Sequence, residues 1–125
     1  MTAQPQRAVL VVEDEWLLAD MVEQQLIDLG HSVVGPAPSV ALALELIARV
    51  HVDCAVLDVN LGGEKSFPIA EALIAARIPF LFMTGYVSKD LPGHFSEVPI
   101  VHKPIEPIAF EQQLRLLSAA AVANR

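Results

Sequence analysis

Five side chains that can handle a phosphoryl group or a divalent cation occur at four separate places in the sequence. Glu13 and Asp14 follow one short apolar run, and Asp58 follows another. Thr84 and Lys103 each follow a further apolar run. Three carboxylates held close together repel one another, so they coexist only beside a cation or with one of them protonated. An ammonium group offsets one charge, and Mg²⁺ or Mn²⁺, which prefer hard oxygen ligands, can offset the remainder.

A carboxylate in such a cluster can act as a nucleophile toward a phosphoryl donor and form an acyl phosphate. The transferred group spreads its charge over three equatorial oxygens, and each of them needs a partner. The metal can take one oxygen, Lys103 a second, and the Thr84 hydroxyl with nearby backbone N–H groups the third. Asp58 is therefore the predicted nucleophile, and Glu13 and Asp14 are the predicted metal ligands.

The apolar runs before these residues predict buried strands, because they are continuous and do not alternate with polar residues. We expect five strands, at Ala8–Val12, Ser32–Gly35, Cys54–Leu57, Pro79–Met83 and Pro99–His102.

Helical periodicity separates the predicted strands. One helix is expected between Glu15 and Leu29, before the stop signal of Gly30. Ser39 is a candidate N-cap for the second helix, Ser66 is one for the third, and the last helix is expected from about Ile105. Strands that alternate with helices predict an α/β fold with a doubly wound five-stranded parallel sheet and helices on both faces. In such sheets the ligand site lies beyond the carboxyl ends of the strands.

Between the fourth and fifth strands the helical pattern is weak. The run Lys89–Gly93 contains Pro92 and Gly93, two helix breakers, so we expect only a short or frayed helix at Ser88–Leu91.

Composition excludes several classes of protein. The 125 residues fit one domain, and the formal net charge of -7 opposes binding to nucleic acid or to anionic membranes. The single cysteine, Cys54, cannot form an internal disulfide, and the four histidines lack metal-ligand spacing. No apolar stretch is long enough to cross a bilayer or to serve as a signal peptide, so a cytoplasmic location is expected.

The motifs in their order closely resemble the receiver domains of two-component response regulators. The matching segments are Val11–Glu15, Leu57–Leu61, Met83–Gly85 and His102–Pro104, each next to a predicted strand. The resemblance implies the flavodoxin-like strand order 2-1-3-4-5. It also implies one receiver domain over residues 1–125, with no output domain.

Carried over by position, Asp58 is similar to the phosphoacceptor of these domains. Asp14 corresponds to the direct metal ligand, with Glu13 acting beside it, often through water. The backbone carbonyl of Asn60 corresponds to a third ligand for Mg²⁺.

The switch residues of the family correspond to Thr84 and Lys103, and the Lys103–Pro104 peptide bond is usually cis in it. Many receivers carry an aromatic switch residue three positions before the lysine, where this sequence has Ile100. Tyr86 follows Thr84 and Gly85 instead, as in a subgroup of mostly single-domain receivers with a Phe-x-Thr-Gly-Tyr signature, and it is the switch candidate. Gly62 replaces a common proline after the acceptor and, with Gly63, suggests a more mobile loop.

The leading functional hypothesis is a stand-alone phosphoacceptor that catalyses only its own phosphorylation and dephosphorylation. A histidine kinase or phosphotransfer protein would donate the phosphoryl group, and the product would control binding of an unknown downstream protein or serve as a phosphate sink. We expect a monomer or weak dimer.

Two other classes stay open. A Mg²⁺-dependent phosphatase that forms an aspartyl phosphate also uses acids at strand ends, but it usually has a second acid where this chain has Asn60. A degenerate receiver could act only as a docking surface. The individual residues also have simpler explanations: Glu13 and Asp14 can cap the first helix, Lys103 can be a solvated lysine, and Tyr86 can pack over the loop.

Overall fold

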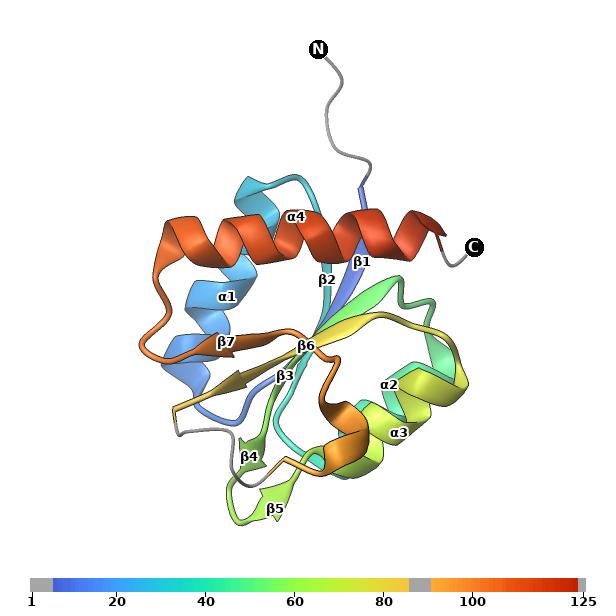
Figure 1. Cartoon of the computed structure of the whole chain (residues 1–125). Coiled ribbons are helices and arrows are strands. Elements are labelled where there is room, and N and C mark those ends of the chain that lie inside the picture. Colours follow the sequence, from blue (N-terminus) through green and yellow to red (C-terminus); the bar gives the residue numbers. More distant parts are fainter. Residues whose placement is uncertain (1–5, 86–90, 124–125) are drawn as a thin grey trace.

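A parallel five-stranded sheet forms the middle layer of the structure (Figure 1), a computed structural model that describes residues 6–85 and 91–123. The strands are β1 (Ala8–Val12), β2 (Ser32–Ala37), β3 (Cys54–Asp58), β6 (Phe80–Thr84) and β7 (Ile100–His102). Their order is β2-β1-β3-β6-β7, and all four neighbouring pairs are parallel. In terms of the five predicted strands this is 2-1-3-4-5, so the predicted fold class and strand order are confirmed.

Helices cover both faces of the sheet. They are α1 (Trp16–Asp28), α2 (Val40–Arg49), α3 (Phe67–Ala75) and α4 (Pro107–Ala123), with a short 3₁₀ helix, η2 (Gly93–Phe95). One core cluster joins the sheet to α1 and α4, and the other joins it to α2, α3 and η2. Because β3 and β6 are buried at every position, apolar runs without alternation are what these strands need.

The N-termini of the helices can be compared with the capping signals in the sequence. Ser39 caps α2 as predicted, since its Oγ accepts a hydrogen bond of 3.2 Å from the Leu42 backbone N–H. Ser66 occupies the predicted N-cap position of α3, but its side chain makes no capping hydrogen bond, and its Oγ is buried without a hydrogen-bond partner among the described residues. Helix α4 begins later than predicted, because Glu106 accepts hydrogen bonds from two backbone N–H groups that follow it.

The loop after Asp58 is a β-hairpin. Two short antiparallel strands, β4 (Asn60–Leu61) and β5 (Glu64–Lys65), pair across a two-residue turn. Gly62 and Gly63 have φ values of 55° and 98°, which suit a type I′ turn and favour glycine at both positions. The paired glycines therefore build a defined turn, where the sequence suggested only a loop.

Most of the predicted weak helix at Ser88–Leu91 lies outside the described residues, and so does Tyr86. Within the described part, η2 follows Pro92, and Phe95 is buried against Phe67 and Phe82 with ring centroids 5.5 Å away from each. A short element anchored by one aromatic ring therefore begins at Gly93, the second of the two predicted helix breakers. Within residues 6–85 and 91–123, no helix combines the length and apolar character needed to cross a membrane.

Candidate functional site

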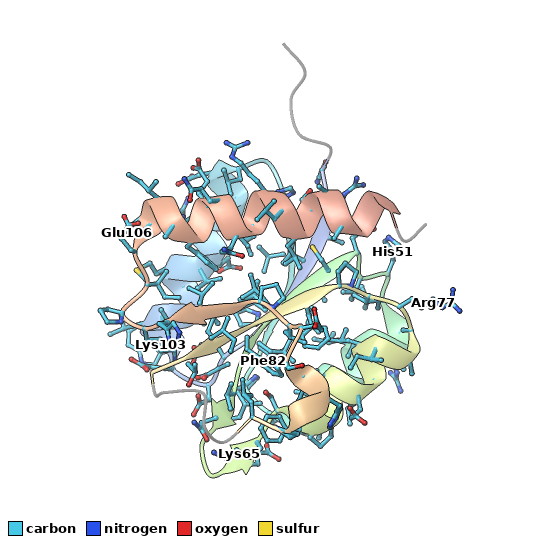
Figure 2. The ribbon with its side chains drawn as sticks, viewed as in Figure 1. His51, Lys65, Arg77, Phe82, Lys103 and Glu106 are labelled. Atoms are coloured by element: carbon cyan, nitrogen blue, oxygen red, sulfur yellow. The ribbon has the colours of Figure 1, made fainter. Side chains whose placement is uncertain are left out.

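Four neighbouring strand ends meet at one rim of the sheet. Glu13 and Asp14 follow β1, Asp58 ends β3, Thr84 ends β6, and Lys103 follows β7. The Lys103 backbone N–H donates a hydrogen bond of 2.8 Å to the Thr84 carbonyl oxygen. The structure therefore brings together the five residues that the sequence singled out, and Figure 2 shows Lys103 at this rim.

The three carboxylates form one acidic cluster. Glu13, Asp14 and Asp58 each offer an oxygen that lies within 4.8 Å of the others. Glu13 and Asp58 are buried, whereas Asp14 is exposed. The Oε1 atom of Glu13 is buried and accepts no hydrogen bond from the described residues. An all-oxygen donor set of this kind fits a hard divalent cation such as Mg²⁺ or Mn²⁺.

Lys103 bridges the two buried acids. Its Nζ lies 2.9 Å from Asp58 Oδ2 and 3.2 Å from Glu13 Oε1. The first contact is a hydrogen bond, and the second is an ion pair without hydrogen-bond geometry. Burial disfavours the charged ammonium, but the hydrogen bond to Asp58 and the charges of both acids outweigh burial and raise the pKa of Lys103. The side chain is thus a charged partner of the cluster and not a solvated surface lysine.

The surroundings of Glu13 disfavour the charged form of its carboxyl group. Its pKa is raised from 4.5 to about 7, chiefly by burial and in addition by the nearby Asp58. Two contacts act in the opposite direction: the Glu15 backbone N–H donates a hydrogen bond of 3.1 Å to Oε2, and Lys103 contributes its positive charge. Additional positive charge at this position, such as a metal ion, would favour the charged carboxylate.

The capping explanation accounts for only part of this arrangement. Glu15 is the N-cap residue of α1, and its side chain makes no capping hydrogen bond. Glu13 does accept the Glu15 N–H, so it helps to define the start of the helix. Capping gives no reason for Asp14, Asp58 and Lys103 to meet at the same place.

Asn60 and its hairpin approach the cluster from the other side. The Asn60 backbone N–H donates a hydrogen bond of 3.3 Å to Asp58 Oδ1. Its side-chain oxygen accepts a hydrogen bond from Lys65 Nζ. A Cβ atom added to Gly62 would lie 3.2 Å from Asp14 Oδ2, so the turn passes close to that carboxylate. The sequence did not point to Lys65 or to the close approach of the hairpin turn to Asp14. The paired glycines were the one signal for this turn.

The remaining candidates are the predicted switch residues and their neighbours. Thr84 is buried at the end of β6, and a Cβ atom added at Gly85 would lie 4.0 Å from Lys103 Cβ, so backbone does come close to the lysine there. The Lys103–Pro104 peptide bond is cis, as the family resemblance implies. Tyr86 lies outside the described residues, so its role as a switch stays a prediction. Ile100 is half-buried and packs against the core.

Known proteins match this chain in sequence. The sequence model described as "Response regulator receiver domain" matches residues 9–115. A curated relative, the phyllosphere-induced regulator PhyR of Methylorubrum extorquens, is 28% identical over 103 residues, which cover 79% of this chain and 39% of the relative. The chain therefore spans about two fifths of the length of that relative.

Solved structures give closer matches. The solution structure of SdrG from Sphingomonas melonis Fr1 is 41% identical, covers 98% of this chain and 99% of its own, and superposes with a TM-score of 0.78. A structure described as the BeF₃-activated conformation of SdrG is 42% identical, covers 94% and 99%, and has a TM-score of 0.76. The crystal structure of anti-anti-sigma factor PhyR from Bartonella quintana is 26% identical, covers 95% and 48%, and has a TM-score of 0.73.

Proposed function

Because the chain belongs to the family of response regulator receiver domains, we propose that it accepts a phosphoryl group on Asp58 and thereby switches its binding to another protein. A histidine kinase or a phosphotransfer protein is the proposed donor. The contact that carries this proposal is the 2.9 Å hydrogen bond from Lys103 Nζ to Asp58 Oδ2, made beside two further acids.

Each step follows from the position of a side chain. A carboxylate oxygen of Asp58 forms the new P–O bond while the P–N bond to the donor imidazole breaks, and the imidazole retains the bonding electron pair. Lys103 already touches Asp58 and would stay with an oxygen of the transferred group. Thr84, buried at the end of β6, would offer its hydroxyl to another oxygen. When bound, Mg²⁺ would neutralise charge on the phosphoryl oxygens.

The metal site is proposed at Glu13, Asp14 and Asp58. Asp14 is exposed and can reach an ion directly, whereas the buried Glu13 is better placed to act beside it. The carbonyl of Asn60 stays the predicted third ligand. Mg²⁺ keeps several water molecules in proteins, which suits a cluster with few protein ligands.

Relatives support a protein partner for the output. PhyR is named as a regulator, and two PhyR structures are described as those of an anti-anti-sigma factor. We propose that phosphorylation of Asp58 shifts the loops that carry Thr84 and Lys103 and so changes a protein-binding surface. The single-domain organisation, the cytoplasmic location and the restriction of activity to the chain's own phosphorylation stay predictions.

Labelling with acetyl phosphate tests the proposal directly. Wild-type protein with ³²P-labelled acetyl phosphate and Mg²⁺ is expected to gain label, and Asp58→Asn is expected to gain almost none. Asp28→Asn, a change to an exposed acid at the end of α1, is the matched control and should label as wild type does. The assignment would be refuted if Asp58→Asn gained as much label as the wild-type protein does.

The phosphatase alternative makes a different prediction. It requires steady multiple turnover on phosphate monoesters, with a general acid for the leaving group. Asn60 occupies the position where such enzymes carry that acid, and its side-chain oxygen is already paired with Lys65. We therefore propose slow, single-site modification, and release of many phosphates per protein molecule would favour the enzyme.

A further inference from the structure

A second lysine lies close to the acidic cluster, on the hairpin that follows Asp58. Asn60 on β4 and Lys65 on β5 are directly opposite each other in this hairpin, so their side chains share one face of it. Lys65 Nζ donates a hydrogen bond to Asn60 Oδ1. The Asn60 backbone N–H donates in turn to Asp58 Oδ1 at 3.3 Å. Hydrogen bonds through a single residue therefore connect the Lys65 ammonium to the phosphoacceptor.

The ammonium of Lys65 is available to a ligand. Its side chain is exposed, and it forms no ion pair within residues 6–85 and 91–123. Its present acceptor, the amide oxygen of Asn60, is neutral. A hydrogen bond between an ammonium and a charged oxygen is roughly twice as strong as one between neutral groups. The contact with Asn60 can therefore be exchanged for a contact with a phosphoryl oxygen.

Lys103 is less accessible than Lys65. Its side chain is 21% exposed, and its Nζ already contacts Glu13 and Asp58. Figure 2 shows Lys65 on the hairpin and Lys103 at the rim, both toward the carboxyl-terminal side of the sheet. The other cationic side chains of the described residues precede a strand or lie within α4: Arg7, Arg49, Arg77 and Arg115. Lys65 is therefore the exposed cation that the described part of the chain offers to an anion arriving at this rim.

An arriving phosphoryl group meets a field of its own sign. The group is an anion, the chain has a formal net charge of -7, and three carboxylates crowd around the acceptor. Charge of the opposite sign beside a site raises the local concentration of a charged ligand, whereas charge of the same sign lowers it. An exposed ammonium next to the acidic cluster offsets part of this repulsion.

We propose that Lys65 binds the phosphoryl group of the incoming donor, with its ammonium leaving Asn60 Oδ1 to donate to a phosphoryl oxygen. A lysine suits this exchange, because its flexible stem carries three donors that can turn from one acceptor to another. The contact forms before transfer and persists in the transition state. It therefore lowers the donor concentration that gives half the maximal rate and leaves the maximal rate nearly unchanged. The inference rests on the proposed function, since it names a further residue that recognises the donor.

Acetyl phosphate and phosphoramidate serve as probes, because the phosphoryl group is what these two small donors share. The rate of Asp58 modification is measured against donor concentration by intact-protein mass spectrometry, with the full chain and saturating Mg²⁺. Lys65→Gln removes the charge but keeps a side-chain N–H donor for Asn60, and Lys65→Arg keeps the charge. Arg49→Gln is the matched control, since it removes an exposed positive charge at the last residue of α2.

For both donors, Lys65→Gln is expected to raise the half-saturating concentration about threefold to tenfold and to change the maximal rate by less than about twofold. Lys65→Arg should recover most of the lost donor affinity, and Arg49→Gln should behave as wild type does. Added salt should raise the half-saturating concentration of the wild type more than that of Lys65→Gln, because the charge of an exposed ammonium is screened.

Mg²⁺ binding separates this role from a purely structural one. Because like charges repel, removal of the Lys65 charge should leave the Mg²⁺ affinity unchanged or slightly higher, as measured by isothermal titration. A loosened hairpin would instead weaken Mg²⁺ binding and donor binding together, since Asn60 contacts Asp58 and the turn passes close to Asp14. Such a parallel loss in Lys65→Gln would overturn the inference.

Further outcomes distinguish the role of Lys65 from the proposed function. If the wild type is modified at Asp58 but Lys65→Gln keeps the wild-type half-saturating concentration, the inference is wrong and the proposed function stands. The same conclusion follows if Lys65→Arg recovers nothing, if Arg49→Gln shows an equal rise, or if the effect occurs with acetyl phosphate alone. If neither donor modifies wild-type protein at Asp58, the proposed function itself is refuted, and the role of Lys65 with it.

Discussion

The two ends of the sheet differ in how their polar side chains are paired. At the carboxyl ends of the strands, Glu13, Asp14 and Asp58 crowd together with one lysine among them. At the amino ends, a cationic residue instead pairs with neutral groups: the Arg7 backbone N–H donates to His31 Nδ1 at 3.1 Å, and the Arg7 Nε donates to the Ser118 carbonyl oxygen at 3.4 Å. One end therefore gathers charges that a cation can offset, whereas the other pairs its charged residue with neutral acceptors.

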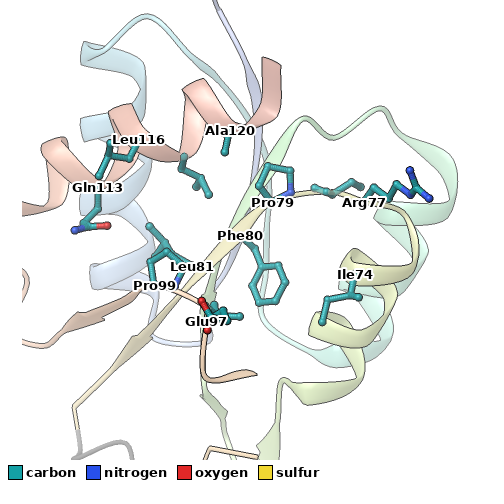
Figure 3. A pocket seen from close by; sticks show the side chains of 13 residues that line it. Ile74, Arg77, Pro79, Phe80, Leu81, Glu97, Pro99, Gln113, Leu116 and Ala120 are labelled. Atoms are coloured by element: carbon teal, nitrogen blue, oxygen red, sulfur yellow. The ribbon is translucent and has the colours of Figure 1, made fainter. Parts of the chain in front are cut away.

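The cavities of the molecule repeat this contrast. A cavity of about 350 Å³ opens near the amino ends of β6 and β7, against α4, and Figure 3 shows Ile74, Pro79, Phe80 and Leu116 around it. Its lining is largely apolar, whereas a groove beside the acidic cluster, between α1 and Pro36, also contains four carboxylates, those of Glu13, Asp14, Asp20 and Glu23. A cavity alone therefore does not locate the chemistry of this chain, and the convergence of charged groups does.

Removing the lysine at the carboxyl end should have the largest effect on stability. Lys103→Met leaves Glu13 and Asp58 buried without their ammonium partner, and one of them must then take up a proton. We expect a loss of about 1–3 kcal/mol in the free energy of unfolding at neutral pH, less than for a fully buried pair, because the Lys103 side chain is 21% exposed. Urea unfolding with and without Mg²⁺ measures it.

The metal serves as the internal control for this variant. Because a divalent cation replaces part of the missing charge, Mg²⁺ should stabilise Lys103→Met by more than it stabilises the wild type. A variant as stable as the wild type, with the same response to Mg²⁺, would show that the acidic cluster is not under strain.

Substitutions in the glycine pair of the hairpin should reduce stability by less than Lys103→Met does, and they test how the hairpin holds Asp14 at the rim. Gly62→Ala and Gly63→Ala both place a side chain at positive φ, which costs about 1–2 kcal/mol. Only the Gly62 variant brings its Cβ within 3.2 Å of Asp14 Oδ2, while nothing among the described residues lies within 4 Å of the Gly63 position. We therefore expect similar losses of stability but a weaker Mg²⁺ affinity, about twofold to fivefold, in Gly62→Ala alone.

Isothermal titration with Mg²⁺ measures that difference, with Gly63→Ala as the matched control. Equal affinities in the two variants would mean that the turn does not hold Asp14 in position.

Much of this rim could be predicted from the sequence because its signals are local. The apolar runs predicted all five strands, and the polar residue after each run predicted which side chains meet. Asp58 and Lys103 lie 45 positions apart, yet each needed only a buried strand before it and a parallel sheet around it. Ser39 likewise capped its helix through a bond that spans three residues.

The features that could not be predicted depend on contacts between distant segments. Ser66 carries the signal of a cap, but packing buries it and its hydroxyl makes no cap. Arg7 and His31 gave no signal at all, because their hydrogen bond exists only once β1 and β2 lie side by side. The hairpin strands are two residues long, too short for periodicity to reveal.

His31 gives the smallest expected effect and tests the amino end of the sheet. Burial, together with the charges of Arg7 and Arg115, lowers the pKa of His31 below 6.5. A lowered pKa in the folded state means that the stabilising contribution of neutral His31 is complete above pH 6.5 and is lost as the pH falls toward the folded-state pKa. His31→Asn keeps an acceptor for the Arg7 N–H but cannot take up a proton.

Between about pH 7 and pH 5, wild-type protein should therefore lose more stability than His31→Asn does, by up to about 1 kcal/mol. Denaturant unfolding at several pH values measures the difference. His102→Asn, a change to an exposed histidine at the carboxyl end of β7, should follow the wild-type curve. Parallel curves for all three proteins would mean that folding does not hinder proton uptake by His31 at the amino end of the sheet. The contrast between the two ends would then rest on the acidic cluster alone.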